Sequence, residues 1–168
     1  MKASAIVYTS NTGYTNEYAA LLGQKTGLAV YALPDAINQL PSGIPIIYLG
    51  WIMAGKIKGY GKAAKKFRIA AVCGVGMGGT GSQIEDLQKG NALPLSLPVF
   101  TLQGGFDMKR LHGVYKLMMT LLAKTVGKEL SQKENPTPEE ADMLDMLMNG
   151  GNRVSQANLT AVLDWYNT

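Results

Sequence analysis

The chain has 168 residues, of which 46% are hydrophobic and 17% charged, and it contains 20 glycines. This length fits one domain with a single core, and the composition excludes a disordered chain, a coiled coil and a disulfide-stapled mini-protein. The one cysteine, Cys73, excludes an internal disulfide and multi-cysteine metal sites. We find no signal-peptide core and no apolar stretch of membrane-spanning length. A cytoplasmic protein is therefore expected, with peripheral membrane contact left open.

The net charge of +4 is spread unevenly along the chain. Residues 1–133 hold 15 basic and 6 acidic residues, whereas residues 134–168 hold 1 basic and 6 acidic residues. We therefore expect a main domain over 1–133 and a differently built segment over 134–168 packed on that same domain. A basic body suits an anionic ligand, an acidic partner or a membrane surface, and no nucleic-acid partner is expected.

Five short, continuously apolar runs rich in β-branched and aromatic residues predict strands covered on both faces. They lie at 4–8, 28–33, 44–49, 69–73 and 98–102. Stretches with helical spacing and end signals alternate with them, at 15–26, 35–40, 59–67, 82–89 and 109–126. This alternation predicts an α/β fold, a doubly wound five-stranded parallel sheet with helices on both sides.

The acidic C-terminal segment predicts two further helices. Thr137, Pro138 and Glu140 form a capping-box pattern before an apolar stripe that ends near Gly150. Ser155 is placed to cap a last helix. We expect a helical hairpin over 137–167, appended to the sheet domain and docked through Met143, Leu147, Leu159 and Leu163.

In such sheets ligands bind at the carboxyl ends of the strands. The first predicted strand runs into a loop with several hydroxyls and a glycine ahead of a helix, an arrangement that can wrap a phosphate with neutral donors. The loop contains Ser10, Asn11, Thr12, Gly13, Tyr14 and Thr15. An ordinary helix cap needs only one such residue, so this density of hydroxyls favours a phosphate site.

This loop resembles the flavodoxin phosphate-loop pattern of hydroxyl, any residue, Thr, Gly, any residue, Thr. The resemblance covers roughly residues 3–127, judged by the matching order of elements. It implies strand order 2-1-3-4-5, FMN as cofactor, and two further loops that hold the isoalloxazine ring.

The predicted loop after the third strand contains Trp51, Met53, Ala54, Gly55 and Lys56. A tryptophan at a strand end is a stacking platform for a flat heteroaromatic ring, although a core aromatic is the alternative. Gly55 resembles the flavodoxin glycine whose peptide flips toward the reduced flavin. Lys56 departs from that pattern, because flavodoxins commonly place an acidic residue there.

The loop after the fourth predicted strand contains Gly74, Gly76, Met77, Gly78 and Gly79. It satisfies G-x-G-x-x-G, but a dinucleotide-binding fold is disfavoured because the first strand has no such fingerprint and no acidic residue lies about 20 residues further on. A Walker A loop is excluded because no Gly-Lys-Ser/Thr follows. The resemblance implies backbone lying against the ring edge, with Met77 where flavodoxins often have an aromatic residue.

Residues 103–124 are similar to the flavodoxin-like bacterial protoporphyrinogen oxidases. We therefore expect an FMN protein acting in electron transfer or small-molecule redox chemistry, with a redox partner protein or a small electron acceptor. A protoporphyrinogen-oxidase-like or quinone-reducing enzyme and a flavin-free interaction module are the alternatives. Lys56 and Lys58 are expected to lie near the flavin ring and to make the reduction potential of FMN less negative. His112, the only histidine, is assigned no catalytic role. A receiver domain is disfavoured because the carboxylates it needs are missing.

Overall fold

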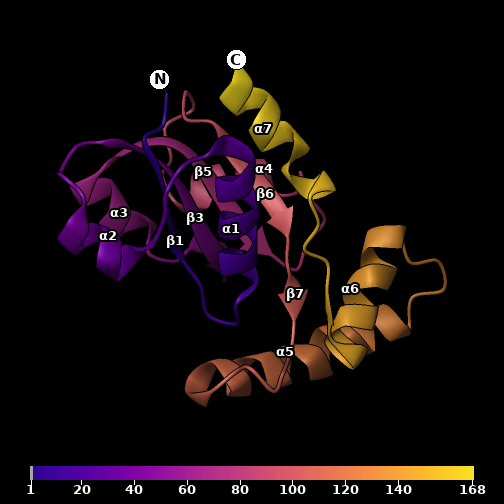
Figure 1. The fold of residues 1–168 in the computed structure, drawn as a ribbon. Helices are drawn as coiled ribbons and strands as arrows, with labels where there is room; N and C mark the ends of the chain where they lie inside the picture. Colours follow the sequence, from indigo (N-terminus) through magenta and orange to yellow (C-terminus); the bar gives the residue numbers. More distant parts are fainter. Residues whose placement is uncertain (1) are drawn as a thin grey trace.

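The computed structural model describes residues 2–168, and its central element is a mostly parallel sheet flanked by helices (Figure 1). The α/β class is confirmed, and the arrangement is compatible with a flavodoxin-like fold. The parallel strands lie in the order β2-β1-β3-β5-β6, and the short β4 pairs antiparallel with the end of β3. Their bounds are β1 (Ala5–Thr9), β2 (Val30–Ala32), β3 (Pro45–Met53), β4 (Lys56–Ile57), β5 (Arg68–Gly76) and β6 (Val99–Gln103).

Two central strands are longer than the sequence pattern predicts. β3 continues through Trp51 and Met53 because its end folds back on β4, with Ile52 opposite Ile57. β5 continues through Gly74 and Gly76, whose missing side chains leave room for Ile52; a Cβ on Gly74 would lie 2.9 Å from Ile52 Cδ1. The expectation that these residues belong to loops is therefore wrong, and they lie in strands.

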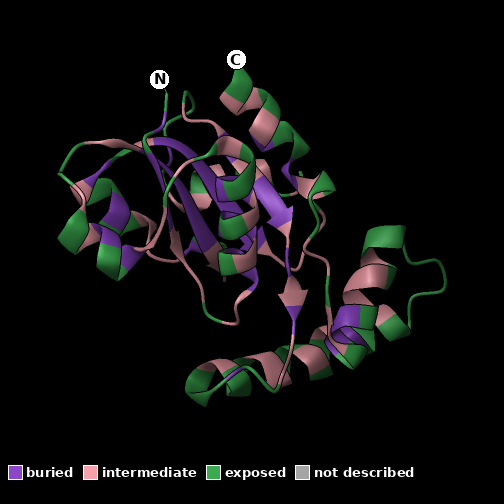
Figure 2. Ribbon diagram, viewed as in Figure 1, coloured by how far each residue is buried: buried purple, intermediate pink, exposed green. Residues whose placement is uncertain are grey.

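Alternating side chains of the strands build one core on each face of the sheet. Ile6 and Ile47 point to the face covered by α1 (Tyr14–Thr26) and α7 (Thr160–Asn167). Val7 and Tyr48 point to the opposite face, covered by α2 (Leu33–Gln39), α3 (Tyr60–Lys66) and α4 (Ile84–Gly90). Figure 2 shows the buried strands between these helical layers.

The predicted fifth helix does not cover the sheet. α5 (Gly113–Ser131) packs on α6 (Pro138–Asn149) and lies below the sheet in Figure 1. A two-stranded stem of β7 (Gly105–Phe106) and β8 (Gly151–Asn152) joins this pair of helices to the body. Residues 105–152 thus form an insert between β6 and the last helix.

The expected hairpin of the last two helices, and with it the expected division at residue 133, is replaced by this insert. α6 packs on α5, whereas the short 3-10 turn η1 (Ala157–Leu159) and α7 return to the sheet, where Leu159 and Val162 are buried beside α1. The predicted cap of α6 is confirmed, because Thr137 Oγ1 accepts from Glu140 N at 3.2 Å and Glu140 accepts from Thr137 N. The hairpin does not form because Gly151 and Asn152 of β8 pair with Phe106 and Gly105 of β7, which separates α6 from α7.

Candidate functional site

A cavity of about 460 Å³ lies where the carboxyl ends of β1, β3, β5 and β6 meet the insert. This volume falls in the ordinary range of small-molecule sites. Ten of the sixteen residues singled out from the sequence line it: Asn11, Thr12, Tyr14, Thr15, Trp51, Met53, Ala54, Gly76, Met77 and Gly78. The other six, Ser10, Gly13, Gly55, Lys56, Gly74 and Gly79, lie in the same segments outside the lining.

The loop after β1 forms the polar end of the cavity. Asn11, Thr12 and Thr15 line it, and Thr15 is only 2% exposed. Ser10 has a different role, since its hydroxyl accepts from the backbone N of Gly13 at 3.1 Å and holds the turn. Gly13 has a φ of 102°, a conformation that favours glycine, and α1 starts at the next residue.

An arginine from the insert lies over this loop. Arg110 Nη1 donates to the carbonyl oxygen of Thr12 at 3.0 Å, and its guanidinium carbon is 5.5 Å from the centroid of the Tyr14 ring. Arg110 Nε also lies 3.4 Å from Asp107 Oδ2, and Asp107 lines the cavity. The polar end therefore has one cation beside its hydroxyls.

The side chain of Trp51 contributes an aromatic wall from β3. Its ring lies edge-to-face with Tyr115 of α5, with centroids 5.3 Å apart and an interplanar angle of 88°. Lys58 Nζ lies 5.8 Å from the centroid of the Trp51 ring. Both aromatic residues line the cavity, so a flat ligand there would meet ring edges and faces from the sheet and the insert.

The turn between β3 and β4 is fastened to the end of α4. Ala54 and Gly55 both have positive φ, 48° and 70°. Asn91 holds this turn, because its Nδ2 donates to Gly55 O at 2.9 Å and its Oδ1 accepts from Ile57 N at 2.9 Å. The Lys56 ammonium donates to the carbonyl oxygen of Gly90. Gly55 and Lys56 are therefore directed toward α4, and the expected place of Lys56 beside the ring site is wrong.

Backbone of the glycine-rich segment after β5 forms a further wall. Gly76 O accepts from Gly104 N at 2.7 Å, and Met77 O lies 3.4 Å from Gln103 Nε2. Gly79 lies outside the lining, where its carbonyl oxygen accepts from Ser82 Oγ at 2.6 Å. The segment thus offers backbone and the Met77 side chain to the cavity.

Apolar side chains of the insert close the remaining side. They share a small core of their own around Phe106 and Met146. Those that line the cavity are Phe106, Leu111, Tyr115, Met118, Met119, Leu122, Val126, Met143 and Leu147. Three methionines of the insert, Met118, Met119 and Met143, therefore form part of the cavity wall.

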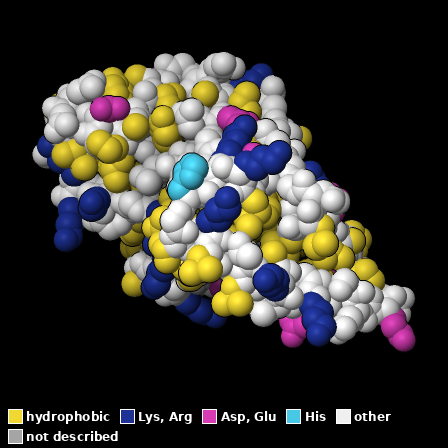
Figure 3. Space-filling view, turned by 90° about the horizontal axis from the view of Figure 1, so that it is seen from below, with side chains coloured by type: hydrophobic (Ala, Val, Ile, Leu, Met, Phe, Trp, Pro, Cys, Tyr) yellow, Lys and Arg dark blue, Asp and Glu magenta, His cyan; other side chains and the backbone are white. Residues whose placement is uncertain are grey.

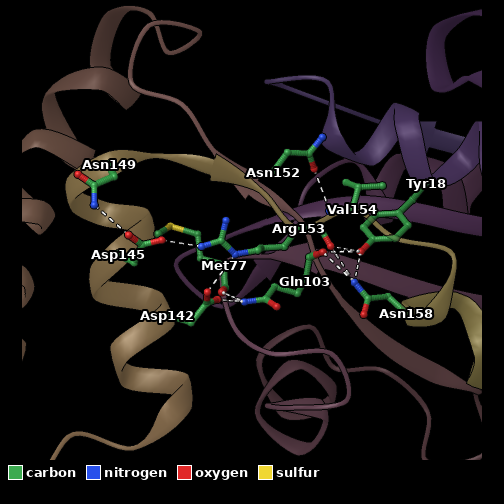
Figure 4. A network of polar contacts seen from close by, with 10 residues as sticks. All are labelled: Tyr18, Met77, Gln103, Asp142, Asp145, Asn149, Asn152, Arg153, Val154 and Asn158. Carbon is green, nitrogen blue, oxygen red and sulfur yellow. Dashed lines mark hydrogen bonds and ion pairs between the residues drawn. The ribbon is translucent and has the colours of Figure 1, made fainter.

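A polar network fastens the insert to the body (Figure 4). Asp142 of α6 accepts from Gln103 Nε2 at 2.6 Å and from Arg153 Nε at 2.9 Å, and Arg153 Nη2 donates to Asp145 at 2.7 Å. Asn158 Nδ2 donates to Arg153 O at 3.0 Å. The network spans the end of β6, α6 and the segment after β8, so it positions the cavity wall.

Few titratable groups face the cavity. Burial raises the pKa of Tyr14, and the nearby Arg110 charge partly opposes that shift. His112 is exposed at the start of α5 and lies outside the cavity lining. Among residues 2–168, no group of three or more His, Cys, Asp and Glu side chains is arranged to hold a metal ion. Cys73 is fully buried, which raises the pKa of its thiol to about 12.

Sequence reasoning missed Arg110, Asn91 and the insert residues of the cavity wall. Arg110 follows the last strand of the sheet, whose carboxyl end shares an edge with the phosphate loop, so its place in the chain was a usable signal. Asn91 follows a predicted helix end and gives no pattern of its own. The insert residues form an apolar stripe that does not reveal which surface it covers.

Comparisons with known proteins assign no family to this chain. No protein-family model matches, and no curated protein matches. A solved structure described as a "Crystal structure of an hypothetical protein" is similar, with 13% identity over 99% of this chain and 73% of that chain. Its TM-score is 0.39, so this likeness carries no argument about fold or function.

Proposed function

We propose that the chain is a flavodoxin-like protein that binds FMN in the cavity at the carboxyl edge of the sheet. The observation that carries this proposal is the meeting of three segments in one cavity: the hydroxyl loop, Trp51 and the backbone at Gly76–Met77. These are the segments that the resemblance assigns to phosphate and ring. When bound, FMN would supply one- and two-electron transfer.

The polar end fits a phosphate group. Thr12 and Thr15 offer hydroxyls, the N-terminus of α1 adds favourable potential, and Arg110 adds a guanidinium that is already paired with Asp107 at 3.4 Å. Arginine pairs well with phosphate oxygens because its donors form a rigid fork. The phosphate would thus meet both neutral donors and one cation, more than the sequence pattern implied.

The aromatic end fits a flat ring. Trp51 and Tyr115 meet at a right angle, while Met77 and the Gly76 backbone line the same cavity from the end of β5, the strand next to β3. Glycine at position 76 makes room for Ile52, which also lines the cavity, because a Cβ on residue 76 would lie 3.1 Å from Ile52 Cδ1. The isoalloxazine ring would therefore pack between side chains of β3 and backbone of β5.

The insert favours an enzyme over a simple electron carrier. Its apolar side chains give the cavity an apolar wall beside the proposed ring site. A carrier needs an accessible flavin edge for a protein partner, whereas an apolar wall suits a small apolar substrate. The second candidate is accordingly a quinone-reducing or protoporphyrinogen-oxidase-like activity.

Flavin titration tests the proposal. Flavin-free protein is titrated with FMN, riboflavin and FAD while flavin fluorescence is followed, and we expect FMN to bind most tightly. Thr12→Val with Thr15→Val should weaken FMN binding roughly 10- to 100-fold for each hydrogen bond to the charged phosphate and spare riboflavin. Thr160→Val, an exposed threonine on α7, is the matched control. No binding of any flavin would overturn the proposal and favour the flavin-free interaction module.

A further inference from the structure

α5 is an exposed helix with a large apolar surface. Of its 19 residues only Gly127 is buried, and its packing partner is α6. Val114, Leu117 and Leu121 are 62%, 71% and 64% exposed. Single exposed apolar residues are ordinary, but several together on one element mark an interaction site.

These residues form one continuous face of the helix. Positions 114, 117, 118 and 121 follow the three- and four-residue spacing that places side chains on one side. Tyr115, Met119 and Val126 lie on the neighbouring side and line the cavity. α5 is therefore apolar on an inner face toward the cavity and on an outer face, Val114, Leu117 and Leu121, toward solvent. Met118 lies between the two faces, because it is 44% exposed and also lines the cavity.

Basic residues accompany the outer face. Lys116, Lys124 and Lys128 are exposed on α5, and Glu129 is its one acidic residue. Lys124 and Lys128 continue the row of the outer face, three and seven residues after Leu121. Figure 3 looks at the molecule from below, the side on which α5 lies, and shows hydrophobic side chains with Lys and Arg among them.

We propose that the outer face of α5 docks on an anionic lipid bilayer, with its apolar side chains in the interface and Lys124 and Lys128 at the headgroups. An amphipathic helix with leucines on one side and lysines beside them is the form in which helices lie in that interface. Each lysine near an anionic surface adds attraction.

The charge of this face argues against a symmetric dimer as its occupant. In a two-fold interface the same patch meets itself, so the lysine rows of two copies would face each other. Lys124 and Lys128 both lie along this row, and Glu129 is the one acidic residue of the helix. An anionic bilayer complements both the charge and the apolar row.

Docking in this orientation would also place the cavity beside the bilayer. The inner face of the same helix forms the cavity wall, so an apolar substrate dissolved in lipid would reach the site after a short path. This last consequence rests on the proposed function. The docking itself does not, and it is tested without flavin.

Vesicle sedimentation tests the docking. Flavin-free protein is mixed with vesicles of phosphatidylcholine alone or of phosphatidylcholine and phosphatidylglycerol in equal parts. We expect binding to the anionic vesicles, weaker binding to the neutral ones, and loss at high salt. Lys124→Gln and Lys128→Gln should each lower the partition coefficient on the order of fivefold.

Leu117→Glu with Leu121→Glu should abolish sedimentation with vesicles. Leu95→Glu is the matched control, because Leu95 is 90% exposed and lies outside α5. Unchanged binding of the α5 double variant, or no binding by the wild type, overturns the proposal. A concentration-dependent dimer that the double variant abolishes, with no vesicle binding, would identify a second copy as the occupant.

A fluorescent label on α5 tests the docking without adding a charged residue that could disturb folding. Leu117→Cys can be labelled selectively because the native Cys73 is fully buried. An environment-sensitive dye at position 117 should shift to the blue on anionic vesicles, and the same dye on Leu95→Cys should not. Equal shifts at both positions would show unspecific adsorption and overturn the proposed orientation.

Discussion

The guanidinium of Arg110 lies 5.5 Å from the ring centroid of Tyr14, and it donates to the carbonyl oxygen of Thr12. These residues are almost a hundred positions apart, so the contact joins the insert to the loop after β1. It places a permanent charge beside hydroxyls that the sequence pattern assigns to a phosphate. An anion bound at these hydroxyls would therefore contact Arg110 and so also the insert.

Removing that charge should affect FMN and riboflavin differently. Arg110→Ala should weaken FMN binding on the order of 10-fold or more, because a charge-assisted hydrogen bond to phosphate contributes about 1.5–3 kcal/mol. Riboflavin has no phosphate and should bind as before. Arg68→Ala, an exposed arginine at the opposite end of β5, is the control. Equal losses for both flavins would show that Arg110 acts only by holding the insert.

Lys58 and Lys56 should differ in their effect on the potential of bound FMN. Lys58 lies over Trp51, whereas Lys56 is held at Gly90. Lys58→Glu should make the potential more negative by tens of millivolts, from the Coulomb energy of a charge about 10 Å away. Lys56→Glu makes the same charge change and should shift it less. Spectroelectrochemical titration at low salt measures both, and equal shifts would contradict the assigned geometry.

Arg153 should control how firmly the insert is held. Arg153→Gln removes its bonds to Asp142 and Asp145, so amides of α6 and of the β7–β8 stem should exchange with deuterium faster than in the wild type. Lys133→Gln, which breaks the exposed pair with Glu140, should have little effect, as surface pairs contribute little. Unchanged exchange in Arg153→Gln would show that the apolar core of the insert suffices.

The same network should loosen in acid. Hydrogen bonds from Asn149 and then Arg153 lower the pKa of Asp145. A depressed folded-state pKa means that the stabilisation is present above the ordinary carboxyl pKa and is lost as the pH falls through the lowered value. Exchange at α6 should therefore accelerate on acidification, and Asp145→Asn should weaken that dependence. An equally steep acid response in Asp145→Asn would contradict this assignment.

Tyr48 should contribute to alkaline unfolding. Burial raises its pKa to about 12, and its hydroxyl hydrogen-bonds with Thr9 Oγ1 and Lys58 O, each at 2.7 Å. Because the folded pKa is raised above 10, this contribution is complete below pH 10 and is lost as the pH rises toward 12. Denaturant unfolding between these pH values should show a loss of about 2 kcal/mol.

Tyr48→Phe separates the two roles of that hydroxyl. It should cost about 1–3 kcal/mol at neutral pH, since buried partners lose a hydrogen bond, and it should flatten the alkaline decline. Tyr31→Phe, a half-buried tyrosine on the edge strand β2, is the comparison. A decline as steep in Tyr48→Phe as in the wild type would assign the alkaline transition to other groups.

Local sequence patterns predicted the strands, the capping box of α6 and the loop that carries the hydroxyls. Those features are local, because a short apolar run such as 69–73 favours a strand that is buried on both faces. Thr137 with Glu140 likewise caps a helix wherever that helix lies. The expected cap by Ser155 is wrong, because neither η1 nor α7 has a side-chain cap. Ten of the predicted site residues line one cavity because parallel strands bring their carboxyl ends to one edge.

The surface that α5 covers and the directions of Arg110 and Lys56 depend on tertiary packing. The apolar stripe of α5 has the same pattern whether it faces a sheet, a cavity or a bilayer, because helical periodicity records that a face is apolar and not its partner. Because Gly105 of β7 pairs with Asn152 of β8, α5 and α6 lie away from the sheet. α7 covers the sheet in their place. Contacts across such sequence distances depend on packing, which no local pattern contains.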